Sequence, residues 1–381
     1  MPSAADAPDE LHVEGVLADE QVRVAVDCGY INAGEFRVAD KQVQPASLDL
    51  TLGEYAHRLR ASFLPDRDPV DAKLKELSQG TIDLHRGGFL EHNVPYLVEL
   101  RERLALPDWL RAKANPKSST GRLDVFTRVI CDNSYHFDEI PRGYQGALYV
   151  EIVPISFPIR VREGLSLNQL RLMAGATPRM TDEEIRALHD ETPLLYRDGK
   201  PVDELALSNG LLVSVDLSGD ADGIVGYKAR SHTRLLDMTG APSDPVDFWE
   251  PIRAERGQRI VLEPEAFYLL LSREGISIPP RFAAEMVAYD PTSGELRTHY
   301  AGFFDPGFGF GPHSPDGSRA ALEVRAHDVP FVVEHGQAVC KLGFERMSAT
   351  PKRLYGADVA SHYQNQSTTL SKYFRGDVTG G

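Results

Sequence analysis

Four residues with complementary chemistry lie within one short stretch of the chain: Lys117, Ser118, Ser119 and Arg122. Lysine and arginine form charge-assisted hydrogen bonds to oxyanions, and serine hydroxyls are short donors. Gly121 in the same stretch lets a ligand approach the backbone closely. A Ser-Ser-Thr-Gly run alone is more often a turn, so the two cations carry the assignment. The cluster predicts a binding site for an oxyanion such as a phosphate.

A single carboxylate, Glu151, lies in the apolar run of residues 147–152 that follows. A glutamate in such a strand is either ion-paired, with Arg122 or Arg128 as the candidate partner, or has a shifted pKa that suits proton transfer. The turn-rich segment before this run contains Asp138, which either caps a tight turn or contacts a ligand. The sequence leaves both pairs of alternatives open.

Three motifs, in this order, resemble those of the deoxycytidine triphosphate deaminases, relatives of the trimeric dUTPases. That family carries R-S-S-x-x-R, H-R-I-D-P-G-W-x-G and V-L-E. Residues 117–122 read K-S-S-T-G-R, residues 135–146 read Y-H-F-D-E-I-P-R-G-Y-Q-G, and residues 149–151 read Y-V-E. The departures are Lys117 for arginine, His136 for arginine, and three extra residues between Asp138 and Gly143.

The resemblance implies hydrolytic deamination of dCTP to dUTP and ammonia. Glu151 would be the general acid/base, and Mg²⁺ would enter with the triphosphate, without metal ligands from the protein. The tail at residues 363–368 resembles a strap that closes over the nucleotide phosphates. The implied phosphate contacts are Lys117, Ser118, Ser119, Arg122, Tyr363 and Gln366, and the implied base and sugar pocket is Ser134, His136 and Asp138.

Three competing functions are weighed against this one. A dUTP pyrophosphatase, alone or combined with the deaminase, would direct water at the α-phosphorus. A non-catalytic nucleotide sensor would use the same fold. A zinc deaminase needs H-x-E and P-C-x-x-C, and Cys28, Cys131 and Cys340 are too dispersed for that motif. We therefore expect no zinc.

An internal repeat relates the two halves of the chain. Tyr96 recurs as Tyr268 and Glu151 as Glu323, each pair offset by 172 residues (for example 268 − 96). A constant offset indicates a duplicated domain. Residues 289–291 read Tyr-Asp-Pro where the first half has Lys-Ser-Ser, although residues 305–307 keep an Asp-Pro-Gly motif. The sequence thus predicts that the second half is mainly scaffold, and that Glu151 rather than Glu323 acts.

Short apolar runs alternate with proline and glycine from Phe89 onward, which predicts an all-β fold. With the resemblance, we expect two tandem dUTPase-like β-barrels joined by a helical linker. The expected divisions are an arm at 1–15, a first barrel at 16–173, a linker at 174–204, a degenerate second barrel at 205–349 and a closing tail at 350–381.

The formal net charge of −15 over 381 residues argues against a nucleic-acid or membrane surface. A chain without a recognisable signal peptide or apolar span predicts a cytoplasmic protein. Because the family places its sites between subunits of a threefold ring, the resemblance implies a homotrimer. The expected form has two stacked rings, each made of like halves. The expected ligands are dCTP as substrate and dTTP or dUTP as a feedback ligand.

Overall fold

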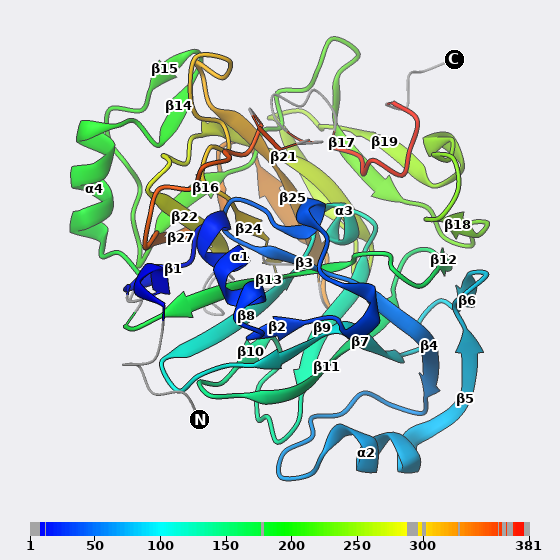
Figure 1. Cartoon of the computed structure of the whole chain (residues 1–381). Helices are drawn as coiled ribbons and strands as arrows, with labels where there is room; N and C mark the ends of the chain where they lie inside the picture. Colours follow the sequence, from blue (N-terminus) through cyan, green and yellow to red (C-terminus); the bar gives the residue numbers. More distant parts are fainter. Residues whose placement is uncertain are drawn as a thin grey trace.

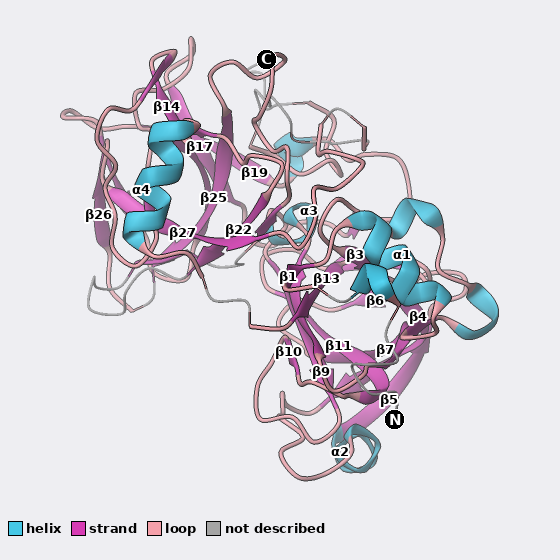
Figure 2. Ribbon diagram, turned by 60° about the vertical axis from the view of Figure 1, so that its left-hand side comes forward, coloured by secondary structure: helices cyan, strands magenta, loops and turns pink. Residues whose placement is uncertain are grey.

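The structure is a computed structural model that describes residues 8–11, 13–176, 179–287, 296–298, 302–326, 328–356, 358–359, 363 and 369–376. Two strand-rich lobes lie side by side, and the short helix α3 (Ser118–Gly121) lies between them (Figures 1 and 2). The predicted all-β fold in two halves is confirmed.

The first half consists mainly of antiparallel strands. Its elements are β1 (Gly15–Val16), α1 (Asp19–Asp27), β2 (Ile31–Asn32), β3 (Leu48–Leu50), β4 (Leu52–Leu59), α2 (Val70–Leu77), β5 (Ser78–Asp83), β6 (Gly88–Leu90), β7 (Tyr96–Ala105), β8 (Leu110–Pro116), α3, β9 (Val125–Cys131), β10 (Glu139–Ile140), β11 (Gln145–Pro154), β12 (Ile159–Val161) and β13 (Asn168–Ala174).

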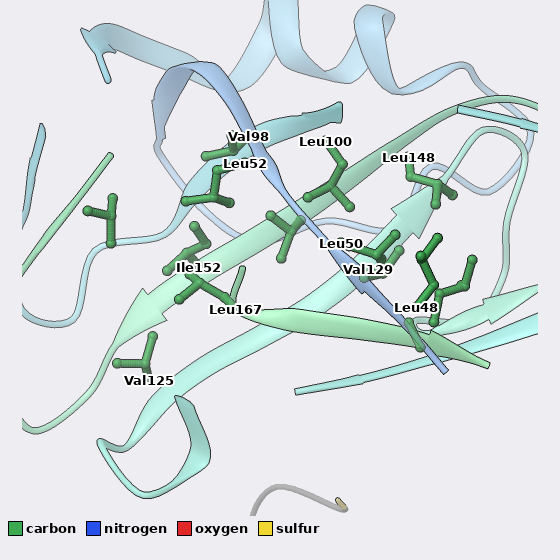
Figure 3. Packing of buried hydrophobic residues seen from close by; sticks show 14 of the residues in the cluster. Leu48, Leu50, Leu52, Val98, Leu100, Val125, Val129, Leu148, Ile152 and Leu167 are labelled. Carbon is green, nitrogen blue, oxygen red and sulfur yellow. The ribbon is translucent and has the colours of Figure 1, made fainter. Parts of the chain in front are cut away.

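Alternation along β11 decides which of its side chains enter the first core. Leu148, Val150 and Ile152 are fully buried among apolar residues of β4, β7 and β9 (Figure 3). Because successive side chains of a strand point to opposite faces, Tyr149 and Glu151 point out of this core. The outward face of β11 is therefore the one that can carry chemistry.

The second half repeats this arrangement. Its elements are α4 (Asp182–Glu191), β14 (Leu195–Arg197), β15 (Lys200–Pro201), β16 (Leu211–Ser214), β17 (Ile224–Ala229), β18 (Leu236–Asp237), β19 (Trp249–Arg253), β20 (Arg259–Leu262), β21 (Phe267–Ile276), β22 (Phe282–Val287), β23 (Leu296–Thr298), β24 (Phe303–Phe304), β25 (Ser318–Ala326), β26 (Phe331–Glu334) and β27 (Ala338–Arg346).

Strand register supports the duplication read from the sequence. In the first half Glu151 of β11 lies opposite Leu97 of β7. In the second half Glu323 of β25 lies opposite Leu269 of β21, and both residues are displaced by the same 172 positions. Glu151 and Glu323 therefore occupy equivalent places on equivalent strands.

The segment expected to be a linker is largely part of the second half. This segment contains the helix α4, which begins where Thr181 accepts a hydrogen bond from the Glu184 N–H and forms a capping box. Ile185 and Leu188 on its apolar face, with Leu195 of β14, are buried in the second core. An amphipathic helix gains most of its stability from such packing, which explains why this segment does not stand apart.

An aromatic cluster joins the two halves. Phe157 of the first half contacts Phe248 and Trp249 of the second, with ring centroids 5.3 and 5.2 Å apart. Phe374, near the end of the chain, adds a ring 5.4 Å from Phe248. The halves thus share part of one apolar core. Within the described ranges, no helix combines the length and apolar character needed to cross a membrane.

Candidate active site

A cavity of about 610 Å³ lies between the two halves. Its wall combines three parts of the chain that are far apart in sequence. The first half contributes Asp49, Lys117, Ser118, Ser119 and Arg122; the second half contributes Phe303, Phe304, Asp305, Ala321 and Glu323; the tail contributes Arg353, Tyr355, Tyr363 and Lys372.

The oxyanion cluster predicted from the sequence forms one wall of this cavity. Strand β8 ends at Pro116, and the chain then turns through α3, so residues 117–122 follow one another around a tight bend. The Arg122 Nε donates to the Ser118 hydroxyl at 3.1 Å, and the Lys117 ammonium pairs with Asp49 of β3. Two cations and two serines therefore lie on the same side of the cavity.

The tail covers part of this cluster. The Arg122 guanidinium stacks over the Tyr363 ring at 3.8 Å, and its Nη1 donates to the Thr369 carbonyl oxygen at 3.1 Å. The Ser371 hydroxyl donates to the Ser119 carbonyl oxygen at 2.8 Å. These contacts place Tyr363 beside Arg122 in the cavity wall, and its expected contact with phosphate stays a prediction. The other expected tail contact, Gln366, lies outside the described residues.

Glu323 faces the oxyanion cluster from the opposite wall. A Cβ atom added to Gly121 would lie 2.6 Å from both carboxylate oxygens of Glu323, so only glycine permits this approach without displacement. Burial raises the pKa of Glu323 well above its usual value, the nearby Arg122 lowers it and Asp124 raises it further. A carboxylate poised in this way can both accept and donate a proton.

Glu151 does not line this cavity. It is fully buried and pairs with Arg128, whose Nη2 lies 2.5 Å from the Glu151 Oε1. Arg128 also stacks on Phe137 at 3.7 Å and donates to the Ser62 hydroxyl at 2.6 Å. Within one chain the Glu151 side chain therefore does not lie beside Lys117, because β11 directs it toward Arg128 and away from the seam between the halves. Its catalytic role stays a prediction.

The expected base and sugar residues lie with Glu151 and not with the phosphate cluster. The Ser134 hydroxyl bonds to the backbone of His136, which is exposed. Asp138 accepts a hydrogen bond from the Val129 N–H at 2.8 Å, as a turn-capping residue would. Burial raises the pKa of Asp138 to about 7, and Arg128 lowers it. None of these three side chains lines the cavity.

The first half covers its own copy of the glutamate-bearing face. Tyr149 on the outer face of β11 packs with Leu97 and Ile130 under Val70 and Leu74 of α2. The equivalent face of β25 is the one that meets the first half, where Ala321 and Glu323 line the cavity. Helix α2 thus covers the outer face of β11, whereas the equivalent face of β25 forms part of the cavity wall.

The two Asp-containing turns are not equivalent in space, although they look alike in sequence. Glu139 of β10 lies opposite Lys113, and Phe303 of β24 lies opposite Glu285, the residue 172 positions after Lys113. Asp138 thus precedes its strand, whereas Asp305 follows the equivalent strand. Asp305, and not Asp138, lines the cavity.

Opposite charges are balanced in the cavity wall. The described lining residues include five cations and five carboxylates, the latter being Asp40, Asp49, Asp305, Glu323 and Asp358. Asp49 Oδ1 is buried without a hydrogen-bond partner. A triphosphate adds further negative charge, so this donor set fits a ligand that brings Mg²⁺, which prefers carboxylate and phosphate oxygens. The cluster of Glu54, His85 and Glu163 lies elsewhere, and two of its members are partly exposed.

Sequence reasoning missed Asp49 and Lys372 and assigned no chemistry to Glu323. Lys372 lies in the tail and is exposed by residue surface area, although partial burial lowers its pKa, and so does Lys117. The repeat offset identifies Glu323 as the counterpart of Glu151, which was a usable signal. No sequence pattern connects the tail lysine to the first half.

Comparisons with known proteins agree with this architecture. Family models described as the N-terminal and C-terminal domains of 2'-deoxycytidine 5'-triphosphate deaminase match residues 13–176 and 181–374. A crystal structure of 2'-deoxycytidine 5'-triphosphate deaminase from Agrobacterium tumefaciens is 44% identical, with a TM-score of 0.82 over 88% of this chain and 99% of that one.

Shorter relatives match part of the chain. A "dCTP deaminase" of Haloarcula marismortui is 26% identical over 169 residues, 43% of this chain and 82% of the relative. A "dCTP deaminase, dUMP-forming" of Methanothermobacter thermautotrophicus is 28% identical over 138 residues, 36% of this chain and 67% of the relative. Since the two family models together span most of the chain, and the paired domains that they describe are the two halves that enclose the cavity, the chain belongs to the 2'-deoxycytidine 5'-triphosphate deaminase family.

Proposed function

We propose that this dCTP deaminase hydrolyses dCTP to dUTP and ammonia in the cavity between its halves, with Glu323 as the general acid/base. One observation supports the assignment above all others. The Glu323 carboxylate, whose pKa is raised, faces the cluster of Lys117, Ser119 and Arg122 across a single cavity. Glu151 shares the strand position but not the cavity.

The proposed chemistry is a proton cycle on Glu323. Lys117, Ser118, Ser119 and Arg122 hold the triphosphate and orient the nucleotide. The Glu323 carboxylate takes one proton from water as the water oxygen bonds to C4 of cytosine, and passes that proton to N3. It then moves the remaining hydroxyl proton to the amino group, so the C4–N bond breaks, ammonia leaves and C4 becomes a carbonyl carbon.

Mg²⁺ would supply neutralising charge to the triphosphate, with Asp49 as the carboxylate beside Lys117. The proton cycle needs no zinc ligands. In this scheme Glu323 activates the attacking water as a general base, so no metal ion is needed for that step.

The proposed site requires one chain only. The first half presents its phosphate cluster and the second half presents its glutamate, whereas the Glu151 face is occupied by Arg128 and α2. In a ring made of three first halves, any site would have to include the Glu151 face. Because that face is already occupied, we propose one site per chain. A homotrimer stays a prediction about how whole chains of 42.1 kDa assemble, to be tested by sedimentation.

A second activity is proposed because several relatives are named dUMP-forming. In such a bifunctional enzyme water would also attack the α-phosphorus and release pyrophosphate. The same cavity holds the triphosphate for both reactions. A feedback role for dTTP or dUTP at this cavity is a further prediction.

Incubation with dCTP and, separately, with dUTP distinguishes these functions. Ammonia without pyrophosphate from dCTP supports the simple deaminase, and ammonia with pyrophosphate supports the bifunctional enzyme. Pyrophosphate from dUTP without ammonia from dCTP would replace the proposal by a dUTP pyrophosphatase. Binding of both nucleotides without either product would leave only the sensor. Added dTTP shows whether the rate is subject to feedback.

A further inference from the structure

A fully buried arginine of the first half extends into the second half. Arg171 lies on β13, directly opposite Lys113 of β8, and its side chain has no exposed surface. Burying a guanidinium is unfavourable unless it is paired, so the contacts of the Arg171 guanidinium indicate its structural role.

Among the described residues, the groups that contact the Arg171 guanidinium belong to the second half. Its Nη1 lies 3.2 Å from Glu345 Oε2 and donates to the Ala284 carbonyl oxygen at 3.4 Å. Its Nη2 lies 3.5 Å from Asp305 Oδ1, and the guanidinium stacks over the Phe303 ring at 3.9 Å. One side chain thus contacts Phe303 of β24 and Asp305, which directly follows β24 at the start of a turn.

That turn is a wall of the proposed nucleotide cavity. Phe303, Phe304, Asp305 and Phe308 all line it, opposite the phosphate cluster. We propose that Arg171 is a positioning residue for the nucleotide site, holding Phe303 and Asp305 against the first half and fixing the charge that the wall presents to the triphosphate. This inference rests on the proposed function insofar as it takes the ligand to be a nucleoside triphosphate.

The duplicated half has no counterpart to Arg171. The residue 172 positions later is Gly343 of β27, and a Cβ atom there would lie 3.0 Å from the Cδ and Nε atoms of Arg179. An arginine at position 343 would collide with that side chain. Arg171 is therefore not inherited barrel structure but a feature of the seam between unlike halves.

Several charged groups act on Asp305. Burial raises the pKa of Asp305 to about 6; Arg171 and Lys117 lower it, and Asp49 raises it. Tyr355 of the tail also faces Asp305, and Glu345 shares the Arg171 guanidinium. Removing Arg171 takes away the largest lowering influence, so Asp305 should then stay protonated to higher pH.

The test follows the pH dependence of dUTP binding, because the product carries the triphosphate and binds without a deamination step. Calorimetric titrations from pH 5 to 8 should show affinity falling in the wild type as Asp305 ionises near pH 6 and repels the phosphates. Arg171→Met should move this midpoint upward by at least about one pH unit, since an opposite charge typically lowers a carboxyl pKa by 1–3.

Lys113→Met is the matched control. It removes a cation from the same seam, where the Lys113 ammonium lies 2.6 Å from Glu285, but it does not touch Asp305. It should keep the wild-type midpoint. Asp305→Asn should lose the part of the pH dependence that belongs to Asp305 and keep the parts that come from Glu323 and from dUTP, and Arg171→Met should no longer alter the pH profile in that background. Ionisation of dUTP itself is common to all the proteins and cancels.

An Arg171→Met protein with the wild-type midpoint, or a Lys113→Met protein with the same upward shift, would overturn the inference. If Arg171→Met does not fold, Arg171→Lys decides, because one ammonium cannot bridge Glu345 and Asp305: a smaller upward shift supports the inference and unchanged behaviour overturns it. Failure of the wild type to bind dUTP would instead count against the proposed nucleotide site.

Discussion

Two glutamates at equivalent strand positions have unlike surroundings. Glu151 is fully buried against Arg128, and Glu323 faces a cavity that also contains Lys117 and Arg122. The difference arises from what covers each strand, and not from the strand itself. Residue type and repeat position alone therefore cannot identify the acting carboxylate.

Lys117 should contribute chiefly to nucleotide binding. Replacing it by alanine removes a charge-assisted contact worth about 1.5–3 kcal/mol and leaves Asp49 without its partner. We expect the KM for dCTP to rise by about tenfold or more, measured by ammonia release. Lys352→Ala, which removes an exposed pair with Glu20, is the control and should leave KM unchanged. Equal KM values in the two variants would remove Lys117 from the site.

The raised pKa of Glu323 predicts a pH-dependent effect on stability. A carboxyl whose pKa is higher in the folded state stabilises the fold at low pH, and this contribution is lost as pH rises through the folded pKa. Glu323→Gln cannot ionise, so its stability relative to the wild type should increase as the pH is raised from 4 to 8.

Near pH 4 the stabilities of wild type and Glu323→Gln should converge, because both side chains are then neutral. Denaturant unfolding at the two pH values measures the difference. A constant difference between pH 4 and pH 8 would show that Glu323 ionises normally in the folded protein.

At the scale of elements, the contact between α3 and β25 forms the site. Gly121→Ala places a methyl group 2.6 Å from both Glu323 oxygens, so the Glu323 carboxylate has to shift. Misplacing a catalytic group by about 1 Å costs on the order of 10²-fold, and kcat should fall accordingly. Gly80→Ala on β5 meets open space and serves as the control. Normal kcat in Gly121→Ala would exclude a working contact between these elements.

The end of the tail is a structural element as well as a cover. Phe374 is buried with Phe248 and Trp249, and Leu370 is also buried. Residues 369–374 of the tail therefore contribute to the apolar core as well as to the cover of the cavity. Phe374→Ala should lower the free energy of unfolding by about 3–5 kcal/mol, measured by denaturant titration. A loss below about 1 kcal/mol would show that the tail packs only loosely.

At the scale of the whole molecule, the sequence predicts the phosphate-binding cluster and the duplicated fold better than it predicts how the two halves pack together. Lys117, Ser119 and Arg122 are close in sequence, so their grouping is local, and the 172-residue offset is a property of the chain alone. Which faces of the two barrels meet depends on packing between residues far apart in sequence, such as Phe157 with Trp249. Local patterns do not contain that information.

The choice between Glu151 and Glu323 shows the same limit. Arg128 is one of the two ion-pair partners that the sequence offers for Glu151, and the structure selects it. The resemblance implies sites that lie between neighbouring barrels. If this rule is applied to the two barrels of one chain, it indicates Glu323. The second half, predicted to be mainly scaffold, contributes Phe303, Asp305 and Glu323 to the cavity wall.

A comparison of Glu323→Gln with Glu151→Gln tests the central claim most directly. Both substitutions keep size and hydrogen bonding while removing proton transfer, and they alter equivalent strands. We predict that kcat for ammonia release from dCTP falls by roughly 10²–10⁴-fold in Glu323→Gln, with dCTP binding largely preserved. Glu151→Gln should stay close to the wild type once any loss of stability from breaking the Arg128 pair is allowed for. A large loss of kcat in Glu151→Gln, with an active Glu323→Gln protein, would contradict a site shared between the two halves.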